Sequence, residues 1–171
     1  MKIFLKGFCI VFLCMSLLGL LWFLIIQPGL TNREAQALKE EYAQPLPGEP
    51  SGELPAGKEQ AASLVNLSAL QAEYPDIKGW ISIPGTCVDY PVLQSSADDP
   101  EYYLRRTYKG EHRTAGSIFF QWDCSPESKN LVVYGHNMSD GTMFAVLQKM
   151  ADETFRKEHS QILLQTSDGL R

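Results

Sequence analysis

Short apolar runs separated by turn residues fill the middle of this 171-residue chain. The runs cover residues 79–83, 88–93, 117–120 and 131–134. Several short strands at this spacing predict a sheet-rich barrel or sandwich. Another apolar run, at residues 161–165, is expected to be a further strand. The predicted fold is therefore mainly β with short helices.

Three short helices are predicted around these strands. Residues 33–43 are rich in Ala, Leu, Glu and Lys, which favour helix, and Pro45 ends the segment. Residues 63–74 place three leucines on one helical face, and Asp140 with its two following residues is expected to cap a helix over residues 143–150.

A segment rich in proline and glycine, residues 44–58, separates the first of these helices from the rest of the chain. Such a segment buries too little apolar surface to fold, so we expect an extended linker. The predicted organisation is a stalk over residues 27–62 followed by one folded domain over residues 63–171.

The N-terminal apolar run, residues 7–26, contains no charge. A helix of this length extends roughly 30 Å, the thickness of the hydrocarbon layer, which predicts an uncleaved single-pass anchor in the cell membrane. Lys2 and Lys6 place residues 1–6 in the cytoplasm and the domain outside, with lipid as a partner of residues 7–26. The alternative is a cleaved signal peptide, and either reading exports the domain.

The charge balance excludes one class of partner. The chain has 15 basic and 20 acidic residues, and removing Lys2 and Lys6 leaves the exported part with a formal charge of −7. Phosphate binding requires clustered Lys and Arg, so we expect no nucleic-acid partner.

Two of the four cysteines are available for chemistry outside the predicted anchor. Cys9 and Cys14 lie within the apolar run and are expected to act as small apolar side chains. Cys87 and Cys124 remain, and an oxidising exterior allows one disulfide between them. Their spacing leaves open whether they pair.

The C-terminal residues predict a β-hairpin. Ser167-Asp168-Gly169 has the chemistry of a hairpin turn, so the strand at residues 161–165 is expected to pair with a strand that follows. The chain ends at Arg171, and an apolar strand without a partner leaves an exposed edge that folded proteins avoid. These features predict that the chain is truncated and its barrel incomplete at the C-terminus.

Among the three histidines, His136 is the candidate acid or base. It follows directly on the run at residues 131–134, and a side chain at a strand end is held rigidly yet faces solvent. His112 and His159 lie in charged, polar segments and are expected to be solvated. The sequence contains neither metal-binding spacings nor a Gly-x-Ser-x-Gly elbow, so no metal, cofactor or serine nucleophile is predicted.

Several segments, in their order and spacing, resemble class B sortases from about residue 64 to the C-terminus. They are residues 74–86, 88–94, 102–104, 116–120, Tyr134-Gly135-His136-Asn137-Met138 and residues 140–144. The resemblance implies a sortase-like β-barrel and a cysteine transpeptidase of Gram-positive cell surfaces. Such an enzyme cuts a C-terminal sorting signal of exported proteins and joins the new end to a peptidoglycan or pilin amine.

The resemblance implies three catalytic groups, of which this chain matches one. His136 stands at the family's histidine, whereas the cysteine nucleophile and the oxyanion-binding arginine of the family come later than this chain extends. Cys87 and Cys124 precede His136 and do not match the nucleophile. Arg105, Arg106 and Arg113 also precede it and are expected to be surface charges. The resemblance thus predicts that this chain is inactive alone.

Two alternatives remain open at the level of sequence. One is a non-catalytic, membrane-anchored surface module that binds a sorting signal or another partner. The other is an unrelated anchored hydrolase in which Cys124 and His136 form the reactive pair.

Overall fold

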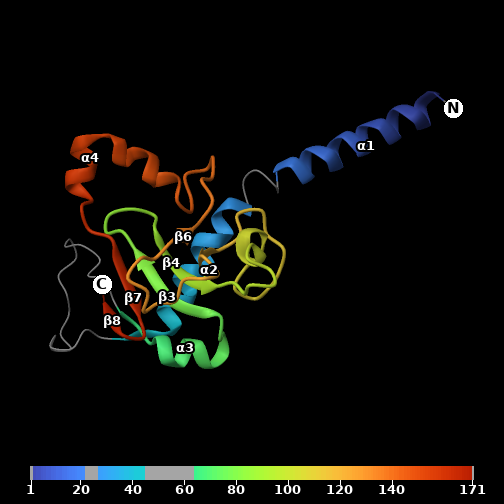
Figure 1. The fold of residues 1–171 in the computed structure, drawn as a ribbon. Coiled ribbons are helices and arrows are strands. Elements are labelled where there is room, and N and C mark those ends of the chain that lie inside the picture. Colours follow the sequence, from blue (N-terminus) through green and yellow to red (C-terminus); the bar gives the residue numbers. More distant parts are fainter. Residues whose placement is uncertain (1, 22–26, 45–63, 171) are drawn as a thin grey trace.

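The computed structural model describes residues 2–21, 27–44 and 64–170, and most of its elements gather around one sheet (Figure 1). Its helices are α1 (Lys2–Leu21), α2 (Gln27–Glu41), α3 (Leu67–Glu73) and α4 (Glu153–Glu158), with 3₁₀ helices η2 (Tyr102–Arg105) and η3 (Ala145–Ala151). Its strands are β1 (Ala43–Gln44), β2 (Leu64–Val65), β3 (Ile77–Ser82), β4 (Asp89–Gln94), β5 (Ile118–Phe120), β6 (Val133–Tyr134), β7 (Leu163–Thr166) and β8 (Gly169–Leu170).

Six strands form one sheet in the order β6-β5-β4-β3-β7-β8, and β1 pairs separately with β2. Strands β3 and β4 are antiparallel, whereas β4 and β5 are parallel. Each apolar run expected to be a strand contributes one. The predicted fold, mainly β with short helices, is confirmed. The six strands form an open sheet, and no closed barrel is found in the described part of the chain.

The predicted hairpin is present within the chain. Strands β7 and β8 are antiparallel and pair Thr166 with Gly169, so the turn lies at residues 167–168. The expectation that the strand at residues 161–165 lacks a partner is wrong. The other edge of β7 pairs with β3, placing Gln165 opposite Trp80, and a sequence pattern cannot show this pairing because the strands lie far apart in the chain.

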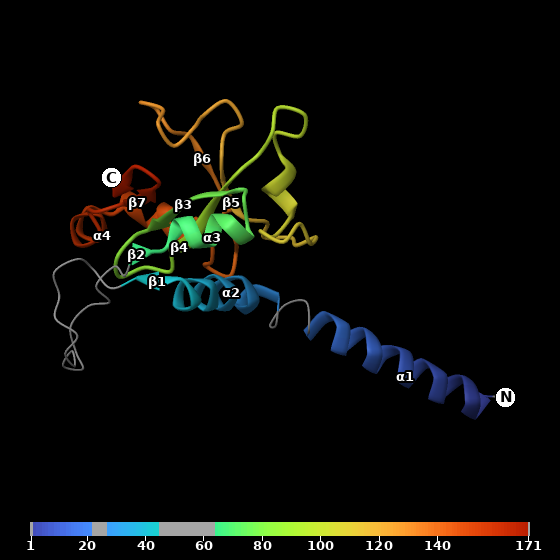
Figure 2. The ribbon, with the colours of Figure 1, turned by 90° about the horizontal axis from the view of Figure 1, so that it is seen from below.

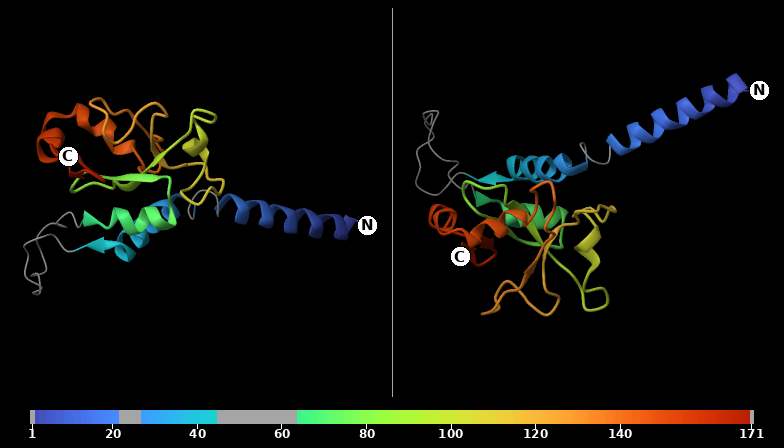
Figure 3. Two further views of the ribbon diagram at one scale, coloured as in Figure 1. Left: turned by 60° about the horizontal axis from the view of Figure 1, so that its bottom comes forward. Right: turned by 90° about the horizontal axis from the view of Figure 1, so that it is seen from above.

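Two apolar clusters occupy the two faces of the sheet because side chains alternate along each strand. Leu93 and Phe119 belong to one cluster, with α3, whereas Val92 and Phe120 belong to the other, with Val146 of η3. Figure 3 shows α2 and α3 on one side of the sheet and the segment of η3 and α4 on the other.

Helix α2 packs against β4, so it belongs to the folded domain and not to the predicted stalk (Figure 2). Leu38 is 3% exposed, and it packs in the cluster of α3. The ammonium of Lys39 lies 2.7 Å from the carboxylate of Asp89, which also accepts a 2.7 Å hydrogen bond from the Trp80 indole. The linker predicted over residues 44–58 lies outside the described residues from residue 45 onward.

The prediction of a membrane anchor over residues 7–26 is corrected by the structure. Helix α1 begins at Lys2 and ends at Leu21, so it includes Lys2 and Lys6, and residues 22–26 lie outside the described residues. Within the described ranges, no helix has the length and apolarity needed to cross a membrane.

The docking of α2 gives a stability prediction. Leu38→Ala removes a buried side chain and leaves a cavity, so it should lower the free energy of unfolding by about 2–5 kcal/mol in urea titrations. Gln36→Ala, on the exposed face of the same helix, should change it by less than about 0.5 kcal/mol. Equal effects of the two substitutions would show that α2 does not pack on the domain in solution.

Candidate active site

His136 stands two residues after the end of β6, as its position in the sequence predicts. Its carbonyl accepts a hydrogen bond of 2.9 Å from the N–H of Phe144, and Asn137 pairs with Met143 in an antiparallel bridge. The segment from His136 to Phe144 is therefore a closed loop, and its two ends are bonded to each other.

Gly135 lets the two ends of this loop approach closely. A Cβ atom at residue 135 would clash with Ile118 and would lie 2.7 Å from the ring of Phe144. Because real Cβ atoms do not approach so closely, the site requires glycine directly before the histidine.

Met143 closes the loop in a left-handed conformation, with φ of 55°. A non-glycine residue pays about 1–3 kcal/mol for such a backbone, which persists only where its surroundings hold it. Here the side chain is buried, and the N–H donates to the hydroxyl of Tyr90 at 3.1 Å.

Asp140 stabilises the turn within the loop instead of capping a helix. Its carboxylate accepts hydrogen bonds from the N–H and the hydroxyl of Thr142, at 2.9 and 2.6 Å. The helix expected at residues 143–150 is the 3₁₀ helix η3, which begins later, at Ala145. The positive φ of Met143 explains the later start, because a left-handed residue cannot continue a helix.

The imidazole of His136 is half-buried and held neutral. Burial lowers its pKa, and the positive charge of Arg105 at the end of η2 lowers it further. Its Nδ1 atom is buried and has no hydrogen-bond partner among the described residues. A neutral imidazole can accept a proton at neutral pH, so His136 has the state that a general base requires.

A groove of about 360 Å³ is lined by Tyr134, two residues before His136, and by Leu104, the neighbour of Arg105. His136 itself is not among its lining residues. Trp122 and Tyr134 are 47% and 45% exposed, so aromatic surface is open to solvent here. The volume falls within the range of ligand pockets.

Neither described cysteine near the domain forms a pair with His136. Cys87 and Cys124 are both free, so the disulfide that the sequence left open is not formed. The thiol of Cys87 donates to the carbonyl of Gly141 at 3.2 Å, and burial raises its pKa. The sulfur of Cys124 contacts Asp123 and the carbonyl of Asn130, which gives the Cys124–His136 hydrolase no support.

The other two histidines differ from each other. His112 is exposed, as expected. His159 is half-buried: its Nδ1 lies 2.9 Å from the carbonyl of Pro84, and its ring centroid lies 4.3 Å from that of Phe155. The expectation that His159 is solvated is therefore wrong, because it joins the end of α4 to the turn after β3.

The three arginines expected at the surface have different roles. Arg113 forms a two-bond ion pair with Glu34 of α2, at 2.6 and 2.8 Å, and its side chain is 11% exposed. Arg106 lies over the ring of Tyr102. Arg105 is exposed but acts on His136, a role that no sequence motif indicates because 31 positions separate the two residues.

The influence of Arg105 is testable by titration. Arg105→Gln removes a positive charge near the imidazole, which favours its protonated form, so the pKa of His136 should rise. NMR titration of the His136 ring proton measures this shift. Arg33→Gln, an exposed arginine on α2, should leave the pKa unchanged. A pKa that stays constant or falls in Arg105→Gln would contradict the assignment.

Comparison with known proteins identifies two relatives of the chain that share one name. No protein-family model matches the chain. Sortase B of Listeria monocytogenes is 46% identical over 95 residues, which cover 54% of this chain and 38% of that protein. Sortase B of Staphylococcus aureus is 32% identical over 142 residues, which cover 81% of this chain and 54% of that protein. The chain thus spans about half the length of these relatives, or less.

Solved structures give the same result. The sortase B structure from B. anthracis in complex with AAEK1 matches with a TM-score of 0.59 and 35% identity, covering 78% of this chain and 58% of that one. Sortase B from Listeria monocytogenes matches with a TM-score of 0.54 and 41% identity, covering 61% and 60%. Over the part that these comparisons cover, the chain belongs to the class B sortases.

Proposed function

We propose that this chain is part of a sortase-type cysteine transpeptidase that cuts a C-terminal sorting signal of exported proteins and joins them to a cell-wall or pilin amine. The observation that carries the proposal is the half-buried His136 with its lowered pKa, fixed two residues after β6, whose Tyr134 lines an open groove. In this function His136 is the general acid and base.

The chemistry follows from the neutral imidazole. The neutral imidazole takes the proton of the thiol, the resulting thiolate adds to the peptide carbonyl, the C–N bond breaks, and the leaving amine takes this proton from the imidazolium. The acceptor amine then attacks the thioester, the C–S bond breaks, and the proton of the amine passes through the imidazole to the released thiolate. A histidine with a lowered pKa releases the first proton readily, and Arg105 favours that release.

The groove supplies a place for the peptide. An extended segment of the sorting signal would lie against the exposed rings of Trp122 and Tyr134. A related sortase B structure is a complex with triglycine, which supports an amine at the end of a short peptide as acceptor.

The nucleophile of this reaction is not Cys87 or Cys124. Burial keeps Cys87 in its thiol form, and neither sulfur is bonded to His136. No cysteine follows His136 in these 171 residues. We therefore propose that the 171 residues do not turn over alone. The groove favours one second candidate, a module that binds a sorting signal without cutting it.

A chimera tests the catalytic role. Residues 27–170 are joined to the remaining C-terminal part of the Staphylococcus aureus sortase B, and transpeptidation is measured with a peptide that this relative cuts and with triglycine. His136→Gln should lower kcat/KM by roughly 100-fold or more, because the proton transfers are lost. His112→Gln, an exposed histidine, should keep kcat/KM within about two-fold of the unsubstituted chimera.

Two results would decide against the proposal. Equal activity of the His136→Gln and His112→Gln chimeras would remove the acid–base role. Transpeptidation by the 171-residue chain without its partner segment would show that its own residues include the nucleophile. Peptide binding by that chain, together with an inactive chimera, would favour the binding module.

A further inference from the structure

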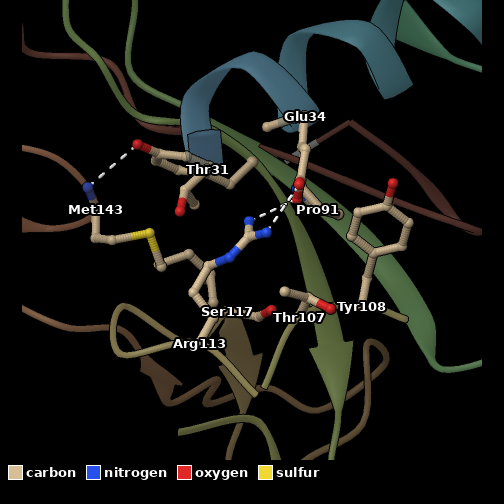
Figure 4. Close-up of a pocket in the computed structure, with 12 residues that line it drawn as sticks. Thr31, Glu34, Pro91, Thr107, Tyr108, Arg113, Ser117 and Met143 are labelled. Carbon is tan, nitrogen blue, oxygen red and sulfur yellow. Dashed lines mark hydrogen bonds and ion pairs between the residues drawn. The ribbon is translucent and has the colours of Figure 1, made fainter. Parts of the chain in front are cut away.

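The hydroxyl of Tyr90 lies buried between α2 and the loop of His136. Tyr90 is on β4 and is 3% exposed. Its hydroxyl donates to the side-chain oxygen of Asn32 on α2 and accepts the N–H of Met143 at 3.1 Å. Figure 4 shows Met143 near Thr31 of α2, with a dashed line from its main-chain nitrogen. A phenol has one proton, so bonding to Asn32 directs that proton towards α2 and leaves the oxygen to accept from Met143.

Met143 directly precedes Phe144, whose N–H binds the carbonyl of His136. The N–H of Met143 binds Tyr90, and the N–H of the next residue, Phe144, binds the carbonyl of His136. The bridge between Asn137 and Met143 joins the two sides of the loop at the same level. The main chain of His136 is thus connected to Tyr90 by two hydrogen bonds and a single intervening residue.

A small cavity lies between α2 and β4, next to Met143. It measures about 30 Å³ and is lined by Tyr90, Met143 and Thr31, whose buried hydroxyl has no partner among the described residues. The hydrogen bond from Met143 to Tyr90, which is itself bonded to Asn32, is a directional link between the loop and α2. Burial raises the pKa of Tyr90 to about 12, so the hydroxyl keeps its proton at neutral pH.

We propose that Tyr90 is a positioning residue for His136: directed by Asn32 of α2, its hydroxyl holds Met143 in its left-handed conformation and so fixes the loop that carries the imidazole. The catalytic role of His136 rests on the proposed function, whereas the placement of its loop does not. In this arrangement, the packing of α2 on the sheet helps to fix the loop of His136.

The test compares Tyr90→Phe with Tyr103→Phe in the 171-residue chain. Tyr103 is equally buried, at 3%, but its hydroxyl binds the carboxylate of Asp76 instead of the His136 loop. Amide hydrogen exchange of Met143 and Phe144, and the pKa of His136, are measured by NMR. Tyr90→Phe should accelerate exchange at both amides roughly ten-fold or more, because their hydrogen bonds lose support. The pKa of His136 should rise towards its ordinary value, because a loosened loop exposes the ring.

The control variant, Tyr103→Phe, distinguishes a positioning role of Tyr90 from a general loss of stability. Tyr103→Phe should leave the exchange of Met143 and Phe144 and the His136 pKa as they are in the unsubstituted chain. The proposal is overturned if Tyr90→Phe changes these quantities no more than Tyr103→Phe does. If Tyr90→Phe unfolds the sheet, Asn32→Ala is the variant to test, because it keeps the ring of Tyr90 in place. Faster exchange at Met143 and Phe144 in Asn32→Ala would then support the proposal. Unchanged exchange would overturn it.

These readouts need no turnover, so they are separate from the test of the proposed function. In the active chimera, Tyr90→Phe should lower kcat with KM within about two-fold, since the groove residues are untouched. If the chimera is inactive but Tyr90→Phe still accelerates amide exchange at Met143 and Phe144, the proposed transpeptidase function is rejected. The positioning role of Tyr90 is retained.

Discussion

The burial of β4 on both faces is the constraint on which the rest of this structure depends. The strand pairs with β3 on one edge and β5 on the other, and its residues from Tyr90 to Leu93 are all buried. A strand in this position requires cover on both faces. Leu38 of α2 and the apolar side chains of α3 supply one cover, and Met143 and Val146, with Ala35 of α2, supply the other. Met143 belongs to the loop of His136, so covering this face of β4 also places that loop.

The sequence predicted the local features well and the long-range ones poorly. The strand at residues 79–83 became β3, and the turn at Ser167 joins β7 to β8, because both depend on neighbouring residues. The docking of α2 was missed because its surface is largely polar and its ion pairs, such as that of Glu34 with Arg113, join residues 79 positions apart. The anchor was predicted from the length of an apolar run, and no helix within the described residues has the length and apolarity to cross a membrane.

At the candidate site, too, the sequence indicates local features but not long-range ones. His136 was found because a histidine directly after an apolar strand is a local signal. Arg105 and Tyr90 were not, since their relation to His136 depends on how η2 and β4 lie in space. The hydrogen bond of the Cys87 thiol also depends on the fold, because the carbonyl of Gly141 that accepts it lies 54 positions away in the chain.

The unpartnered Nδ1 of His136 has a consequence for the tautomer of the ring. In many catalytic histidines, a hydrogen bond to one ring nitrogen decides which nitrogen carries the proton. The described residues place no such bond on His136, whose loop is held through the main chain instead. The two neutral tautomers are therefore not distinguished by a partner among the described residues, and the position of the ring depends on the backbone of its loop.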